Sequence, residues 1–170
     1  MPVSREQFEN SFNVSRETIE RLEVYHSLLV KWNPRINLVS KATIDDIWHR
    51  HFADSVQLWS HLPKECKSWL DFGSGAGFPG LVGAVVAQEL NPDLKLHLVE
   101  SDHRKCAFLL TVVRELGLNV EVSSERIEVI RKQEADVITA RALAPLTKLL
   151  EFSLPHAHKS TVLLFPKGNT

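Results

Sequence analysis

Apolar residues in the first third of the chain recur at the three- and four-residue spacings of amphipathic helices. The first such set is Ile19, Leu22, Tyr25, Leu29 and Trp32. These positions share one face of a helix, which we expect Pro34 to end. A second helix is predicted from near Thr43 to just before Pro63. Its inward-facing residues would be Ile44, Ile47, Trp48, Phe52, Val56 and Trp59. We expect the tryptophans of this region to pack the helices onto the rest of the chain.

After Pro63 the pattern changes to short apolar runs that alternate with longer amphipathic ones. Strands are predicted at residues 68–73, 95–100, 119–123, 136–140 and 161–165. Helices fit between them at about 80–90, 102–116, 125–131 and 143–153, with Gly117 as a helix C-cap. This alternation predicts an α/β fold with a mostly parallel sheet and right-handed crossovers. We divide the chain into an N-terminal helical region, residues 1–66, packed on a Rossmann-like core, residues 67–170.

Composition narrows the possible environments and partners. The 170 residues are 44% hydrophobic and 24% charged, which is ordinary for one globular domain. No apolar run approaches the roughly 20 residues of a transmembrane helix, and the polar start lacks the features of a secretion signal. Two cysteines without metal-site spacing fit a reducing cytoplasm. The lack of such an apolar run predicts no membrane partner. Because the net charge is −1, we expect no DNA partner, and any RNA-binding surface must be local.

The most informative stretch is WLDFGSGAGFPG, residues 69–80, where a strand ends in glycines at alternate positions before an apolar helix. Such loops hold nucleotide-type cofactors at the carboxyl end of a sheet. Gly75, Gly77 and Gly80 satisfy the dinucleotide pattern G-x-G-x-x-G. The D-x-G-x-G-x-G pattern that starts at Asp71 looks like motif I of S-adenosylmethionine-dependent methyltransferases. Pro79 removes a loop N–H that a pyrophosphate would use, and an acid suits an α-ammonium group, so the methyltransferase template is favoured.

Residues at the ends of later strands would complete this site. Glu100 ends the second strand and can accept hydrogen bonds from both ribose hydroxyls, as an acid does in dinucleotide folds; the alternative is a solvated carboxylate. Ile127 and Glu128 follow the third strand, where Ile127 would offer apolar surface to an adenine ring, unless this segment only starts a helix. Arg141 ends the fourth strand and would meet cofactor or substrate phosphate, or else form a surface salt bridge.

Several motifs together resemble one family. WNPRINLVS at 32–40, HFADS at 51–55, LDFGSGAGFPG, TARALAPL at 139–146 and LFPKG at 164–168 are similar to those of the RsmG (GidB) family of bacterial 16S ribosomal RNA guanine-N7 methyltransferases. The resemblance covers nearly the whole chain. It implies S-adenosyl-L-methionine as cofactor and one guanine of 16S rRNA as substrate, within the small ribosomal subunit or its assembly intermediate. We expect a monomer.

The resemblance also implies which residues contact the cofactor. By motif position these are Gly73 and Phe78 in the loop, Ile127 and Glu128 after the third strand, and Arg141; Gly75 and Glu100 join them from the analysis above. Methyltransferases of this class have a seven-stranded sheet with a C-terminal antiparallel hairpin. The sequence ends just after the fifth predicted strand, so we expect those C-terminal strands to be missing.

The predicted chemistry requires no general base. Guanine N7 has an in-plane lone pair and no proton, so the enzyme's task is positioning, and no catalytic acid or base is assigned. The His49/His51 and His156/His158 pairs do not share a helix face, so no metal is expected. His51 and Asp54 are expected to pair with each other. Basic residues outnumber acids at 31–50 and 139–170, as an RNA patch or as scattered solvated charge.

Two other functions remain open on the sequence alone. The overlapping glycine pattern allows an NAD(P)-binding oxidoreductase. A cofactor-binding but non-catalytic ribosome assembly factor would show the same motifs, since no catalytic side chain is required by the first hypothesis either.

Overall fold

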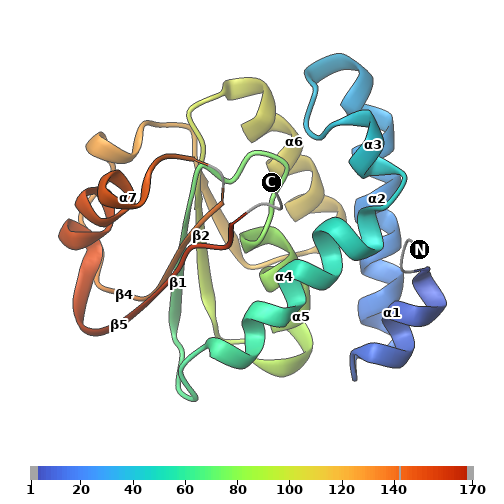
Figure 1. Cartoon of the computed structure of the whole chain (residues 1–170), viewed down its shortest axis with the longest axis horizontal. Coiled ribbons are helices and arrows are strands. Elements are labelled where there is room, and N and C mark those ends of the chain that lie inside the picture. Colours follow the sequence, from blue (N-terminus) through green and yellow to red (C-terminus); the bar gives the residue numbers. More distant parts are fainter. Residues whose placement is uncertain (1–3, 142, 168–170) are drawn as a thin grey trace.

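A computed structural model of the chain describes residues 4–141 and 143–167. Figure 1 shows a central sheet with helices on both of its faces and a further layer of N-terminal helices on one side. The helices are α1 (Arg5–Ser11), α2 (Arg16–Ile36), α3 (Lys41–Ile44), α4 (Asp54–Gln57), α5 (Gly80–Leu90), α6 (His103–Leu116) and α7 (Leu146–Ser153). None of the helices in these residues is both long and apolar enough to cross a membrane.

The described strands form one parallel sheet. They are β1 (Ser68–Phe72), β2 (Lys95–Val99), β3 (Val120–Ser123), β4 (Ala135–Ala140) and β5 (Ala157–Leu164). Their order is β3-β2-β1-β4-β5, so β1 lies at the centre, with β2 and β3 on one side of it and β4 and β5 on the other. In the register, Phe72 stands beside Val99 of β2 and Ala140 of β4. The α/β fold with a parallel sheet is therefore confirmed, and the carboxyl ends of β1, β2 and β4 meet at one edge.

Alternating residues of the strands build two cores, one on each face. Trp69, Leu96 and Val137 point to the face covered by α5 and α6, whereas Leu70 and Ile138 point to the opposite face. The opposite face packs against α7. The first core continues outward without interruption into α1, α2 and the segment before α4. The three N-terminal tryptophans pack partly buried against this core, as predicted. The division at residues 66 and 67 stays a prediction.

The predicted helix over residues 43–62 is wrong as a single regular helix. After α3 the backbone forms a π-helical segment, Trp48–Ala53, then α4, then the 3₁₀ turn Leu58–His61. The buried side chains of Ile47 and Phe52 are five residues apart, a spacing that a π-turn places on one face and an α-helix does not. Sequence reasoning assumed the α-helical period throughout and therefore missed the change.

Other boundaries differ for local reasons. Helix α2 passes Pro34, because a proline near the end of a helix removes only one hydrogen bond. The helix ends at Ile36, and Asn37 follows as its C-cap in the left-handed conformation. The predicted helix at 125–131 is only the 3₁₀ turn Ile127–Val129. Strand β5 begins at Ala157 rather than at residue 161. Its first residues are mostly polar and pair with β4 through a register shift, so the sequence pattern gave no sign of a strand there. Gly117 caps α6 with φ +61°, as predicted.

Candidate functional site

The glycine loop between β1 and α5 turns through three left-handed residues, with φ of +61° at Gly73, +54° at Gly75 and +100° at Gly77. The conformation is required most strictly at Gly77, since a Cβ there would lie 2.7 Å from Leu81 Cβ and would also overlap the Tyr25 hydroxyl. Tyr25, on α2, donates a hydrogen bond from that hydroxyl to the carbonyl of Ala76. The outer helical layer therefore holds the loop directly.

A cleft of about 480 Å³ opens beside the loop, at the carboxyl ends of the central strands. Its volume lies within the range of small-molecule sites. Six of the seven residues predicted to bind the cofactor line it: Gly73, Gly75, Glu100, Ile127, Glu128 and Arg141. They come from four separate connections of the chain, and the parallel topology brings them together. The space above Gly75 is open, since a Cβ added there would meet nothing nearer than 3.8 Å.

Glu100 is fixed by the backbone on both sides. Its Oε1 accepts a hydrogen bond from the Gly75 N–H at 2.9 Å, and its Oε2 accepts one from the Asp102 N–H at 2.9 Å. Each carboxylate oxygen retains a second lone-pair direction. The side chain is almost fully buried yet lines the cleft. An acid in this setting is ready to accept further donors, such as a pair of hydroxyl groups, without first having to be ordered.

Ile127 and Glu128 differ in their surroundings although they are neighbours. Ile127 is half-buried and packs against the core on the α7 side, so it presents a fixed apolar surface to the cleft. Glu128 is exposed at the rim. The 3₁₀ turn that carries both follows β3 by only a few residues, which is why it lies at the same edge as the glycine loop.

Phe78 lies elsewhere than predicted. Its side chain is 5% exposed and does not line the cleft. The ring stacks on His51 with centroids 4.4 Å apart, and stacks on Tyr25 on the side of the outer helices. The Arg141 guanidinium carbon lies 5.4 Å from the same ring centroid. The Phe78 ring thus contacts the Arg141 guanidinium instead of facing the cleft.

His51 binds Arg141 and not Asp54, so the expected His51–Asp54 pair is wrong. Its Nδ1 accepts a hydrogen bond from Arg141 Nη2 at 2.7 Å. Burial lowers the pKa of His51 to about 4, with the nearby Arg141 and Arg50 acting in the same direction. The ring is therefore neutral at pH 7, and an acceptor at Nδ1 requires the proton at Nε2. The π-helical segment turns this side chain toward the sheet.

Asp71 does not serve the role that the sequence suggested. It is fully buried beneath the loop, where its Oδ1 accepts a hydrogen bond from the Thr139 hydroxyl at 2.6 Å. Burial raises the pKa of this carboxyl to about 6. A cofactor ammonium group in the cleft would not touch it. Its place in the motif is structural, because it joins β1 to β4 under the turn.

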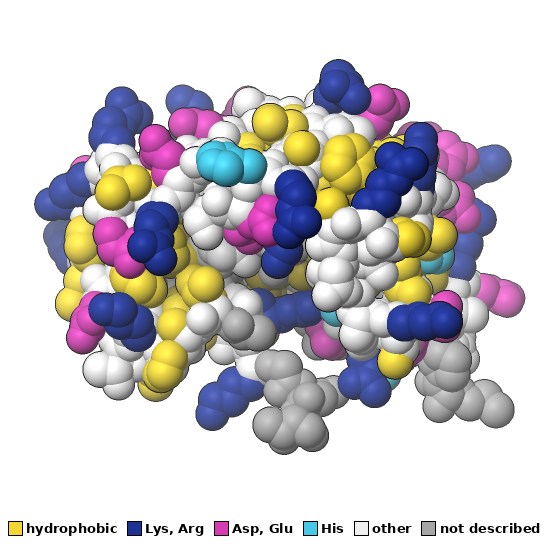
Figure 2. Space-filling model, turned by 90° about the horizontal axis from the view of Figure 1, so that it is seen from above, with side chains coloured by type: hydrophobic (Ala, Val, Ile, Leu, Met, Phe, Trp, Pro, Cys, Tyr) yellow, Lys and Arg dark blue, Asp and Glu magenta, His cyan; other side chains and the backbone are white. Residues whose placement is uncertain are grey.

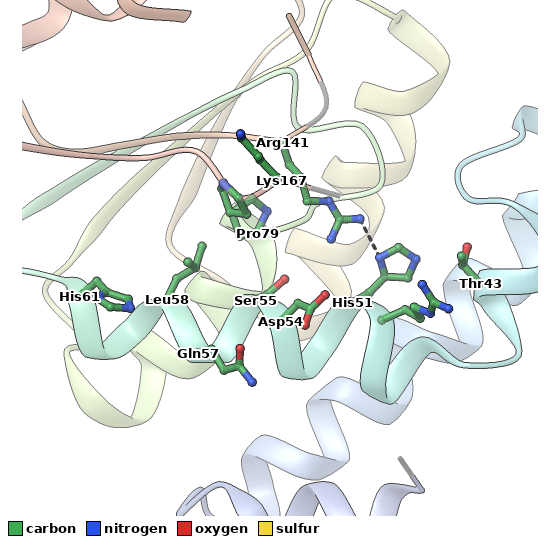
Figure 3. Close-up of a pocket in the computed structure, with 12 residues that line it drawn as sticks. Thr43, His51, Asp54, Ser55, Gln57, Leu58, His61, Pro79, Arg141 and Lys167 are labelled. Carbon is green, nitrogen blue, oxygen red and sulfur yellow. Dashed lines mark hydrogen bonds between the residues drawn. The ribbon is translucent and has the colours of Figure 1, made fainter. Parts of the chain in front are cut away.

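A second hollow of about 450 Å³ lies on the other side of Arg141. Figure 3 shows Arg141, Lys167 and Pro79 on one side and the helical stretch through His51, Asp54, Ser55 and Leu58 on the other. Arg141 lines both hollows. The sequence analysis did not identify this hollow. A usable signal was present, since His51 and Ser55 are polar residues four apart on a stretch whose other inward positions are apolar.

The sequence matches the profile of the GidB family, described as rRNA small subunit methyltransferase G, over residues 18–170. The chain belongs to this family. A family member from Ruegeria sp. (strain TM1040), named ribosomal RNA small subunit methyltransferase G, is 51% identical over 156 residues, which is 92% of this chain and 76% of that protein. The family resemblance seen in the motifs is thereby confirmed.

Solved structures agree on the fold. A putative O-methyltransferase from Klebsiella pneumoniae superposes with a TM-score of 0.61 at 15% identity, covering 95% of this chain and 70% of that one. An S-adenosylmethionine-dependent methyltransferase from Thiobacillus denitrificans, solved with S-adenosyl-L-homocysteine, superposes with a TM-score of 0.55 at 14% identity, covering 69% and 50%. At these identities the likeness establishes the Rossmann-like methyltransferase architecture alone.

Proposed function

We propose that this GidB-family protein transfers a methyl group from S-adenosyl-L-methionine to N7 of a guanine in 16S rRNA of the small ribosomal subunit. The family match over residues 18–170 carries the proposal. The preformed cleft beside the glycine loop supports it, because its size and its lining suit an adenosine-containing cofactor.

The residues of the cleft fit this cofactor group by group. Glu100 would accept the ribose hydroxyls, Ile127 would cover one face of the adenine, and the backbone at Gly73 and Gly75 would approach the amino acid part closely. Glu128 lies at the rim beside Ile127. Arg141 would border both the cofactor and the substrate, held in place by His51 and Phe78. When bound, S-adenosylmethionine supplies an electrophilic methyl group on a positively charged sulfur.

The chain's own contribution to the reaction is then positioning. The lone pair of guanine N7 bonds to the methyl carbon as the carbon–sulfur bond breaks, and the electron pair of that bond stays on sulfur. The guanine gains the positive charge and loses no proton, so no general base is needed. Holding the two groups in line can supply roughly 7–11 kcal/mol. Arg141 is suited to this because the hydrogen bond to the uncharged His51 and the contact with the Phe78 ring orient its guanidinium.

The two other functions are not favoured. An oxidoreductase would need a pyrophosphate at the loop, where Pro79 stands at the start of α5 without an N–H, and the family match is to methyltransferases. A purely non-catalytic assembly factor would not explain why the cleft and the second hollow meet at one arginine.

The partner would be the small subunit or its assembly intermediate, met by a monomeric enzyme in the cytoplasm. Figure 2 shows Lys and Arg side chains spread over the face seen from above and interspersed with Asp and Glu, with the surface hollowed between them. Scattered cations of this kind give salt-sensitive but modest RNA affinity. Much of the specificity would then come from the shape of a structured target.

Titration calorimetry tests the cofactor assignment. We expect S-adenosylhomocysteine to bind and NAD not to bind, and Glu100→Ala to weaken binding at least tenfold because two loop hydrogen bonds and the hydroxyl acceptors are lost together. Glu115→Ala, an exposed acid on α6, is the matched control and should bind like the wild type.

Methyl transfer tests the reaction. Small subunits from a strain that lacks the modification should accept labelled methyl groups from the wild type, and Gly73→Val or Arg141→Ala should abolish transfer. Binding of NAD with no binding of S-adenosylhomocysteine would reject the proposal. So would full activity of both variants.

A further inference from the structure

The second hollow has a mixed charged lining that binding of the cofactor in the first cleft does not explain. Its wall carries three cationic side chains, Arg50, Arg141 and Lys167, and one carboxylate, Asp54. Arg50 already pairs with Asp46 at 3.5 Å, whereas Asp54 forms no ion pair among the described residues and is exposed where it lines the hollow. A site for a simple anion would not place a free carboxylate among its cations. A nucleotide, by contrast, has an anionic phosphate and a base edge that donates hydrogen bonds.

Two buried polar atoms of the same wall have no hydrogen-bond partner among the described residues. They are His51 Nε2 and Ser55 Oγ, whose side chains are only 6% and 3% exposed. Unpaired buried donors cost stability and are uncommon in native structures. Figure 3 shows both side chains on the side of the helical stretch that faces Arg141 and Pro79. Their donors point to an occupant with acceptor atoms.

We propose that this hollow receives the target guanine and that Asp54 accepts hydrogen bonds from its N1–H and N2–H₂ groups. The inference rests on the proposed function. Guanine presents these donors on one edge and the acceptors N7 and O6 on the other. With the donor edge against Asp54, the N7 edge faces away from it, toward the cofactor cleft, and Arg141 borders both hollows beside that path. Phosphate would then lie toward Lys167 and Arg50, away from the carboxylate.

The same contact would serve both choice of base and rate. Adenine has an acceptor at N1 and no N2 amino group, so it would leave the Asp54 carboxylate unpaired, a situation that discriminates strongly. Methylation at N7 gives the guanine a positive charge, and a carboxylate hydrogen-bonded to the ring stabilises that charge as it develops. Asp54 therefore acts on kcat more than on KM.

Asp54→Asn is the test variant, because it keeps the shape and removes the charge. We expect kcat/KM for unmodified small subunits to fall about 100-fold, mostly in kcat, while S-adenosylhomocysteine affinity and thermal stability stay at wild-type values, since Asp54 does not line the cofactor cleft. Asp54→Glu should recover part of the rate. Asp45→Asn, at an exposed position outside the hollow, is the matched control and should behave as wild type.

Mononucleotides separate this inference from the proposed function. With S-adenosylhomocysteine present, the wild type should bind GMP at least fivefold more tightly than AMP, and Asp54→Asn should lose the preference. If the wild type transfers no methyl group but shows this preference, the proposed function fails and the guanine site stands. If the wild type transfers methyl groups and Asp54→Asn retains a third or more of its kcat/KM, the function stands and the guanine site is overturned. A parallel loss of S-adenosylhomocysteine binding in Asp54→Asn would also overturn it.

Discussion

Single residues in this protein are constrained most tightly where two layers meet at the glycine loop. Gly77 combines a φ of +100° with contact to α2 and α5, because the Tyr25 hydroxyl and Leu81 leave no room for a Cβ. Gly117 has a similar left-handed backbone, φ +61°, but nothing lies within 4 Å of the position of a Cβ. Both glycines could be recognised in the sequence as turn positions. Only the packing around each glycine shows that a side chain would be tolerated at position 117 and not at position 77.

Gly77→Ala should destabilise the protein far more than Gly117→Ala. We expect about 1 kcal/mol at Gly117, where the cost is conformational alone, and roughly 1–3 kcal/mol more at Gly77, where overpacking is added. Urea denaturation followed by circular dichroism measures both. Equal losses would show that the loop yields easily to an added methyl group.

At the scale of elements, periodicity predicted most helices and strands, and it failed where the hydrogen-bonding pattern changed. The run from α3 through the π-helical segment to Leu58–His61 follows no single period, because Ile47 and Phe52 are both buried at a spacing of five. The π-helical geometry matters for the site, because this segment carries His51, which binds Arg141. Helix α2 has a comparable task, as Tyr25 reaches the carbonyl of Ala76 in the loop.

Tyr25→Phe should uncouple α2 from the cofactor loop. The variant keeps the ring stacked on Phe78 and removes the hydrogen bond to Ala76, so a buried carbonyl is left unpaired at a cost of about 1–3 kcal/mol. We also expect weaker S-adenosylhomocysteine binding by calorimetry, because the loop loses a fixed point.

Ser27→Ala, on the exposed side of the same helix, is the control for that experiment. An unchanged affinity in Tyr25→Phe, together with unchanged stability, would mean that the loop holds its shape without α2.

Across the whole molecule, the outer helices, the sheet and the loop converge on Arg141. His51 from the outer layer, Phe78 from the loop and the end of β4 all meet it, and it separates two hollows of similar volume. Because His51 is neutral, folding carries a cost at acidic pH. The histidine must stay unprotonated in the folded state while the unfolded chain binds the proton.

Replacing His51 by Gln should change the pH dependence of stability in one direction. The pKa of His51 is about 4 in the folded protein and about 6.5 in the unfolded chain. Between these values the unfolded chain binds more protons, so wild-type stability falls as the pH falls, by at most about 1.4 kcal/mol per pH unit. The total over the window is on the order of 2–3 kcal/mol.

In His51→Gln this loss is absent, so the difference in unfolding free energy between variant and wild type should move in favour of the variant from pH 6.5 down to pH 4. Asp71, whose pKa is raised to about 6, makes the opposite contribution: protonating it as the pH falls increases the free energy of unfolding. This contribution is the same in both proteins and cancels in the difference. Parallel stability curves would contradict a neutral, buried His51.

The sequence by itself determined the strand–helix alternation, the glycine turn and the family, because each depends on the local period, on backbone freedom or on motifs that occur together in order. It also placed Gly73, Gly75, Glu100, Ile127, Glu128 and Arg141 at one edge, since a parallel sheet brings the carboxyl ends of its strands together. Only the tertiary structure decided that Phe78 and Asp71 are buried. It also decided that His51 is hydrogen-bonded to Arg141 and that a second hollow lies beside them. Those outcomes depend on contacts between residues tens of positions apart, and side-chain direction at such contacts is set by packing, which no local pattern encodes.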